Sequence, residues 1–346
     1  MPETAPLYPL LFEPIYKEKV WGGRALARLG RDLPGDRDTA IGESWELVDL
    51  ATTSASGGGG AAEHSVVATG PLAGKTINQL IAQFGRGITG ETSADTSPAF
   101  PLLIKYLDAN DNLSVQVHPS PEYAAAHREA HLKSEAWYVV DCAPDAVIYK
   151  DLMPGVTEPQ LRAALEANTD DAVVPLLRAV PVKPGDCHYL PSGTCHALGA
   201  GVLVAEVQTP SDTTFRVYDW GRTGRELHVE QAMACIDFDH PGDDPPNAWE
   251  RNTVRAEPKA LYTNLVACPY FEIERVDAEA GYETTVQPDR PEVWMVLQGV
   301  LALATTDGPA TRATQGSTLL LPPGAGRVDL SAEAGSQWLR VTLASN

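Results

Sequence analysis

The chain has 346 residues, 43% of them hydrophobic, and a formal net charge of −20. This length can bury a sizeable core and predicts two domains. The negative charge argues against nucleic acid as a partner, because a phosphate backbone needs a basic surface. The chain has neither an apolar run long enough to cross a bilayer nor a charged-then-apolar leader, so we expect a cytoplasmic protein that does not bind membranes. The five cysteines include no Cys-x-x-Cys pair, which argues against a disulfide framework.

The first part of the chain predicts short strands with a few short helices between them. Strands and turns between Leu7 and Leu50 are expected to belong to a first β-barrel. Apolar residues at helical spacing predict a helix from Thr76 to Phe84. Ser120-Pro121-Glu122 is typical of a helix start, and Thr157-Glu158-Pro159-Gln160 of a capping box.

Two pairs of polar side chains at strand spacing lie between residues 113 and 135. In Leu113–Pro119, Gln116 and His118 are two residues apart and would point to the same face of a strand. Lys133 and Glu135 have the same spacing at the start of the next apolar run. Two such strands would direct an amide, an imidazole, an ammonium and a carboxylate into one interior.

A second imidazole comes from the stretch Lys183–Ala197. Its Pro-Gly and Pro-Ser-Gly turns predict turn, strand, turn, and then His196 at the start of another strand. The pattern Pro-Gly-Asp, four residues, Pro-x-Gly, two residues, His is a signature of the cupin barrel, with His196 at its metal-ligand position. With Gln116, His118 and Glu135, this is the ligand chemistry of a divalent metal, most naturally zinc. The nearby cysteines are interpreted as small core residues.

The following strands carry further polar residues. Val202–Gln208 is apolar except at Glu206 and Gln208, and a carboxylate in such a run is costly unless it is paired or functional. Thr214, Arg216, Tyr218 and Trp220 are expected to share one face of the next strand. An acidic, Pro-rich connection runs from His228 to Pro258.

From about Leu261 the chain repeats the barrel pattern without its metal-binding chemistry. This part contains no histidine, and Arg327 stands where the metal-binding histidine of a cupin would fall. We therefore predict a zinc-binding catalytic cupin domain with helical insertions over residues 1–240. A degenerate cupin domain is predicted over residues 255–346.

The chain resembles the type I mannose-6-phosphate isomerases (phosphomannose isomerases) of the short bacterial kind. The stretches that carry the resemblance are Phe12–Gly23, Ile41–Glu46, Pro101–Lys105, Leu107–Pro119, Lys183–Ala197 and Ser211–Arg222. The resemblance implies a mainly β fold of two cupin (jelly-roll) β-barrels with a few short helices, the second barrel being degenerate. It also implies the zinc ligands Gln116, His118, Glu135 and His196, and Arg216 as the active-site arginine.

The activity implied is a zinc-dependent aldose–ketose isomerisation with one zinc ion per chain. Mannose 6-phosphate and fructose 6-phosphate would interconvert by proton transfer through a cis-enediol, with Lys133 and Glu206 as competing candidates for the base. Because the net charge repels a phosphate, local cations must attract it, and those near the motifs are Lys105, Lys133, Arg216, Arg222 and Arg225. Ser114, Lys105 and Arg222 are expected to bind substrate.

Two alternatives stay open from the sequence. One is a related zinc cupin isomerase that acts on another or an unphosphorylated sugar, and the other is a non-catalytic sugar-binding cupin. The presence of the metal ligands and of Arg216 favours an enzyme over the second. The sequence leaves the oligomeric state undetermined.

Overall fold

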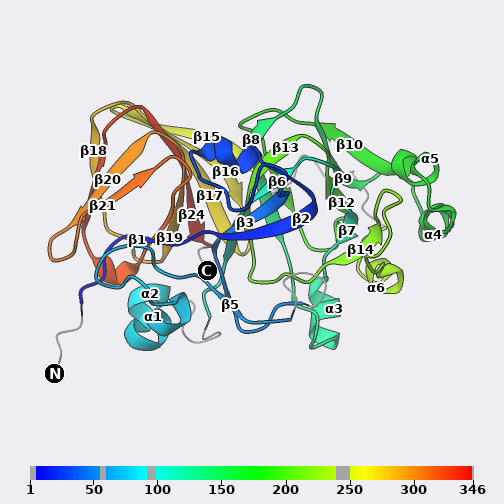
Figure 1. The fold of residues 1–346 in the computed structure, drawn as a ribbon, viewed down its shortest axis with the longest axis horizontal. Helices are drawn as coiled ribbons and strands as arrows, with labels where there is room; N and C mark the ends of the chain where they lie inside the picture. The colour runs from blue at the N-terminus through cyan, green and yellow to red at the C-terminus, as the bar shows by residue number, and fades with distance from the viewer. Residues whose placement is uncertain (1–4, 55–59, 92–98, 239–249, 345–346) are drawn as a thin grey trace.

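The computed structural model describes residues 5–54, 60–91, 99–238 and 250–344. It consists mainly of antiparallel strands, with a few short helices, and this confirms the expected fold class. Two groups of sheets lie side by side (Figure 1): the blue-to-green strands other than β1 form one barrel, and the yellow-to-red strands, with β1, form the other. The connection expected from His228 to Pro258 is corrected in part, because α6 (Val229–Met233) and β15 (Glu250–Glu257) lie within it; its residues 239–249 lie outside the described part of the chain.

The first barrel consists of two facing sheets. The six-stranded sheet has the order β11 (Cys187–Leu190), β8 (Glu135–Cys142), β13 (Val202–Gln208), β6 (Leu103–Ala109), β3 (Ile41–Leu47) and β2 (Ile15–Gly23). The five-stranded sheet has the order β10 (Leu177–Pro181), β9 (Val147–Leu152), β12 (His196–Leu198), β7 (Val115–Val117) and β14 (Phe215–Tyr218). Buried apolar side chains from both sheets, among them Trp137, Ile148 and Leu198, pack together in the barrel interior. The short pair β4 (Asp49–Leu50) and β5 (Glu63–His64) stands apart.

The second barrel also has two sheets. The seven-stranded sheet has the order β1 (Leu10–Leu11), β22 (Thr318–Leu321), β19 (Glu292–Gln298), β24 (Ser336–Leu343), β17 (Phe271–Ala278), β16 (Ala260–Ala267) and β15 (Glu250–Glu257). The four-stranded sheet has the order β18 (Tyr282–Val286), β23 (Val328–Ala332), β20 (Val300–Thr305) and β21 (Thr311–Thr314).

Strand β1 corrects one expectation from the sequence. The whole stretch from Leu7 to Leu50 was expected in the first barrel, but Leu10 pairs with Leu320 in the second. Both leucines are fully buried in a core cluster that spans the two barrels. Burial of apolar surface at the junction therefore decides where this strand pairs.

The predicted helix starts are confirmed by their caps. Helix α1 (Ile77–Phe84) has a capping box formed by Thr76 and Gln79, and α4 (Glu158–Ala167) has one formed by Thr157 and Gln160. In α3 (Pro121–Ala126), the Ser120 side chain accepts the Tyr123 N–H at 3.2 Å. The remaining short elements are α2 (Arg86–Thr89), α5 (Asp170–Val173), α6 (Val229–Met233) and the 3₁₀ turns at Ala25–Leu29, Val174–Leu176 and Pro323–Ala325.

Helices α4, α5 and α6 lie beside the five-stranded sheet (Figure 1), and their apolar residues pack with those of β7 and β14. Within the described ranges, we find no helix long and apolar enough to span a membrane.

A bulge in β14 corrects a second expectation. Its register with β7 shifts between Arg216 and Tyr218. Arg216 faces the interior cavity, whereas Tyr218 packs in the cluster beneath the helices and donates its hydroxyl to Asp170. The expectation that Thr214, Arg216, Tyr218 and Trp220 share one face is therefore wrong beyond Arg216, because an extra residue in a bulge reverses the alternation of side chains.

Candidate metal centre

Three buried side chains converge inside the first barrel. Glu135 Oε2 lies 3.3 Å from His118 Nε2, and Glu135 Oε1 lies 3.2 Å from His196 Nε2. One potential ligand atom from each residue falls within a cluster no wider than 4.8 Å. All three side chains are at most 1% exposed. The sequence placed these residues in one interior, and the structure brings them together.

The two sheets of the barrel supply the cluster jointly. On the five-stranded sheet, His196 on β12 is the direct register partner of Gln116 on β7, and His118 follows just after β7. On the facing sheet, Glu135 is the first residue of β8. Directly opposite residues of antiparallel strands share a face, so this pairing directs Gln116 and His196 to the same side, where their side chains meet Glu135 of the facing sheet.

Both imidazoles present an unprotonated nitrogen to the cluster. His118 Nδ1 lies 3.0 Å from the Thr213 carbonyl oxygen, and His196 Nδ1 lies 2.8 Å from the Thr194 carbonyl oxygen. A carbonyl can only accept a hydrogen bond, so each Nδ1 carries the proton and each Nε2 keeps a lone pair. Burial and the charge of Lys133 lower the pKa of His118 to about 3, against the opposing effect of Glu135.

The polar atoms of the cluster fit a divalent cation. Apart from the Lys133 ion pair, His118 Nε2 and both carboxylate oxygens of Glu135 are buried without a hydrogen-bond partner in the described part of the protein. The amide of Gln116 has its Nε2 3.3 Å from His196 Nε2, and a half-turn of the amide would present its oxygen there. Two imidazoles, a carboxylate and an amide oxygen form a set of donors that can hold a metal ion.

Lys133 lies against the cluster. Its Nζ is 2.7 Å from Glu135 Oε2, and its side chain is 5% exposed. Burial opposes the charge of Lys133, but Glu135 and Glu206 outweigh it and raise the pKa of the ammonium group. In turn, burial would raise the pKa of Glu135, but Lys133 and His118 hold it well below its usual range. The cluster therefore contains an ionised carboxylate.

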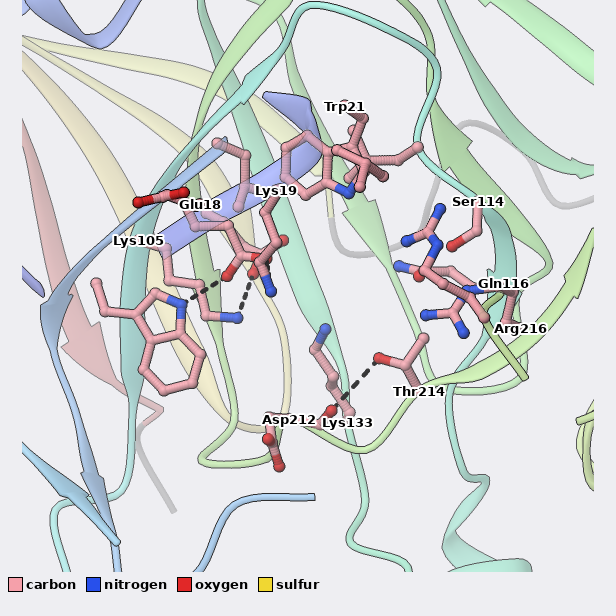
Figure 2. A pocket seen from close by; sticks show the side chains of 17 residues that line it. Glu18, Lys19, Trp21, Lys105, Ser114, Gln116, Lys133, Asp212, Thr214 and Arg216 are labelled. Atoms are coloured by element: carbon pink, nitrogen blue, oxygen red, sulfur yellow. Dashed lines mark hydrogen bonds and ion pairs between the residues drawn. The ribbon is translucent and has the colours of Figure 1, made fainter. Parts of the chain in front are cut away.

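A cavity of about 240 Å³ opens above the cluster and reaches it at Gln116 and Lys133. Figure 2 shows Ser114, Gln116 and Arg216 on one side of this cavity, Lys19 and Lys105 on the other, and Lys133 between them. The basic side chains of the lining are Lys19, Lys105, Lys133, Arg216 and Arg225, and its acidic ones are Glu18, Glu43, Glu206 and Asp212. The lining thus carries five basic and four acidic side chains, whereas the chain as a whole has a net charge of −20.

The wall around Lys105 holds two further carboxylates. Glu206 lies 3.5 Å from Lys105 Nζ and accepts the Trp137 indole N–H at 2.9 Å. Burial and the charge of Glu135 raise the pKa of Glu206. Glu43 lies 3.1 Å from Lys19, and although burial opposes its charge, Lys19 and Lys105 lower its pKa to about 2. The two acids therefore have opposite tendencies: Glu43 stays ionised and Glu206 takes up a proton more readily.

The opposite side of the cavity carries two guanidinium groups. Arg216 is 6% exposed, donates to the Glu226 carbonyl oxygen at 2.8 Å, and has a buried Nε with no hydrogen-bond partner among the described residues. Arg225 also lines the cavity and is ion-paired with Asp219. Arg222 pairs with Asp219 at 2.8 Å and donates to the Asn112 carbonyl oxygen, and it is not among the described residues that line the cavity.

Sequence reasoning did not single out Lys19 and Glu43. Both lie within the stretches that carry the family resemblance, Phe12–Gly23 and Ile41–Glu46, and this was the available signal. Gly42 explains their placement, because a Cβ there would lie 2.6 Å from Lys19 Cβ and 2.7 Å from the Trp21 ring. The glycine lets β2 pack closely over β3 at the cavity wall.

Comparisons with known proteins agree with this geometry. The family model of the phosphomannose isomerase type I catalytic domain matches residues 10–145. The chain is 40% identical over 274 residues to mannose-6-phosphate isomerase ManA of Bacillus subtilis, covering 77% of this chain and 78% of that protein. It is 37% identical over 273 residues to the mannose-6-phosphate isomerase of Streptococcus mutans, covering 77% of each protein.

A solved structure extends the similarity to the whole fold. The crystal structure of the mannose 6-phosphate isomerase from Bacillus subtilis aligns with a TM-score of 0.81 at 28% sequence identity, covering 97% of this chain and 99% of that one. The alignment includes both barrels. These similarities, together with a cluster of side chains that can hold a metal ion, show that the chain belongs to the type I phosphomannose isomerase family.

Proposed function

We propose that the protein is a metal-dependent isomerase that interconverts mannose 6-phosphate and fructose 6-phosphate. The observation that carries this proposal is the His118–Glu135–His196 cluster, whose neighbours Gln116 and Lys133 line a cavity that also holds further lysines and arginines. A sugar phosphate has one reacting end, at C1 and C2, and one anionic end. The cavity offers a partner for each, and the family membership supports this pairing.

We propose zinc as the metal, with one ion per chain held by Gln116, His118, Glu135 and His196. Imidazole nitrogen and carboxylate oxygen are common zinc ligands, and the buried, unpartnered atoms of His118 and Glu135 suit such an ion. When bound, zinc polarises carbonyl and hydroxyl oxygens of the substrate. Glu135 is the single anionic ligand, so the centre keeps a net positive charge that suits an enediolate.

Glu206 and Lys133 are proposed to handle the proton. The raised pKa of Glu206 favours a carboxylate that takes a proton from C1 or C2 and returns it to the other carbon. The raised pKa of Lys133 favours an ammonium that donates a hydrogen bond to a sugar oxygen during the transfer. A positioned acid or base typically contributes about 10²–10⁴-fold to the rate.

The phosphate is proposed to bind between Arg216, Ser114 and Arg225. A guanidinium group carries five N–H donors and matches phosphate geometry, and the buried Nε of Arg216 has its donor free for such a contact. Lys105 faces the sugar from the opposite wall beside Glu206. Arg222 acts indirectly, because it helps to hold Asp219, which in turn orients Arg225.

The predicted domain over residues 255–346, which holds most of the second barrel, is proposed to serve packing and not to bind a metal itself. On its seven-stranded sheet, Arg340 of β24 forms a two-bond ion pair with Glu292 of β19, at 2.6 and 2.8 Å, and Trp294 donates its indole N–H to the same carboxylate at 2.9 Å. These contacts satisfy the buried acid within the protein. We propose residues 1–240 as the catalytic domain.

The test compares mannose 6-phosphate with mannose in a coupled assay of the purified protein. We expect isomerisation of the phosphorylated sugar and at least about a hundredfold lower kcat/KM for mannose, which lacks the anion. His196→Ala should remove the metal and the activity, whereas Cys195→Ser, which changes a buried core residue one position away, should keep both. Equal activity on both sugars, or metal loss in Cys195→Ser, would contradict the proposal.

A further inference from the structure

A partly buried ion pair joins the seven-stranded sheet to the first barrel. Glu250 is the first residue of β15, and its Oε1 lies 2.7 Å from Lys150 Nζ on β9. The same oxygen accepts the backbone N–H of Tyr189 on β11 at 2.9 Å. Lys150 is 7% exposed. One carboxylate oxygen of the second barrel therefore contacts a strand of each sheet of the first.

These two contacts lie next to the candidate metal ligands. Lys150 is the direct register partner of His196 at the end of the β9–β12 ladder, and it precedes Asp151, whose φ is 79°. Tyr189 adjoins Leu190, the register partner of Glu135 in the β11–β8 ladder. Glu250 thus holds the strand beside His196 and the strand beside Glu135.

The position of Glu250 also explains why such a link is needed. Strand β11 is the outer strand of the six-stranded sheet, so its outward N–H groups have no strand partner there. His196 belongs to the five-stranded sheet and Glu135 to the six-stranded one, so the spacing of these two ligands depends on how the sheets are held together. Metal sites tolerate only a few tenths of an ångström in ligand placement.

We infer that Glu250 and Lys150 are positioning residues that set the separation of His196 from Glu135 and, through it, the affinity for the metal. They do this without touching the cluster, because the ion pair acts through the β9–β12 and β8–β11 ladders. The inference rests on the metal centre proposed above. It gives the second barrel a role in the site of the first, since β15 belongs to the sheet of the second barrel.

The test measures zinc affinity by competition with a chelator in the full-length protein. Glu250→Gln keeps an acceptor for the Tyr189 N–H and loses the ion pair, and Lys150→Met keeps most of the side-chain volume. Glu257→Gln is the matched control, because Glu257 lies on the same strand and its ion pair with Arg255 is exposed. The visible spectrum of the Co²⁺-loaded proteins reports the ligand geometry directly.

We expect both single variants to bind zinc about tenfold more weakly and to alter the Co²⁺ spectrum, and the double variant to be no weaker than either single one. The control should match the wild type. Wild-type affinity and spectrum in folded Glu250→Gln and Lys150→Met would overturn the inference while leaving the metal centre intact. A wild-type protein that binds neither ion would overturn the metal centre itself. If Lys150→Met fails to fold, the zinc affinity and Co²⁺ spectrum of Glu250→Gln decide the question, because that substitution is nearly isosteric.

Discussion

Replacing Arg216 with alanine tests the proposed anion site most sharply. The side chain is almost fully buried, lies on the cavity wall and makes one hydrogen bond to the Glu226 carbonyl oxygen. Its remaining donors can reach a substrate oxygen, and a hydrogen bond to a charged group contributes about 1.5–3 kcal/mol. Two such bonds at the lower end of this range, about 1.5–2 kcal/mol each, amount to about 3–4 kcal/mol, which corresponds to roughly a 10²–10³-fold loss in kcat/KM.

The assay is steady-state isomerisation of mannose 6-phosphate, with metal content measured on the same samples. Arg216 is not among the proposed ligands, so Arg216→Ala should keep its metal and its fold. Arg216→Lys should recover only part of the loss, because an ammonium cannot reproduce the planar fork of the guanidinium group. A loss mainly in KM assigns Arg216 to the phosphate, and a loss mainly in kcat assigns it to the enediolate. Retention of more than about a third of the wild-type kcat/KM, with metal bound, would refute this reasoning.

Two further predictions concern stability. The folded-state pKa of Glu43, lowered to about 2, lies below its usual value, so its charge stabilises the protein above about pH 4.5 and the contribution is lost as the pH falls towards 2. Urea unfolding should show Glu43→Gln destabilised by roughly 3 kcal/mol at pH 6, and this difference from wild type should shrink below pH 4.5. A difference that stays constant with pH would contradict the lowered pKa of Glu43. Glu292→Ala leaves Arg340 with only its longer ion pair to Glu274, at 3.4 Å, and removes the acceptor of the Trp294 indole N–H, so it should cost about 2 kcal/mol of unfolding free energy. The metal content of Glu292→Ala should stay at the wild-type level. A loss of metal would show that the second barrel takes part in metal binding.

The metal cluster was predictable because strand alternation fixes which side chains share a face. Gln116 and His118, and likewise Lys133 and Glu135, are two residues apart, and both pairs keep their side chains together although His118 and Lys133 lie just outside β7 and β8. The caps of α1 and α4 were predictable for a similar reason, since a capping box is a local pattern of side-chain and backbone groups.

Features that depend on contacts distant in sequence were not predictable. The pairing of Leu10 with Leu320 joins residues at opposite ends of the chain, and no local pattern distinguishes β1 from a strand of the first barrel. The bulge after Arg216 reverses the side-chain alternation without a glycine or proline to mark it. The ion pair between Glu250 and Lys150 spans the two barrels, so its place beside the ligand strands emerges only once both are folded.

The most direct test of a metal-dependent isomerase is a titration of the metal-free protein with zinc, followed by the rate of mannose 6-phosphate conversion. The structure offers one cluster of this kind among the residues it describes. We therefore expect activity to be absent after chelation, to rise in proportion to added zinc, and to reach its plateau at one equivalent per chain. Full activity in protein that holds well below one equivalent of any divalent metal would contradict the account.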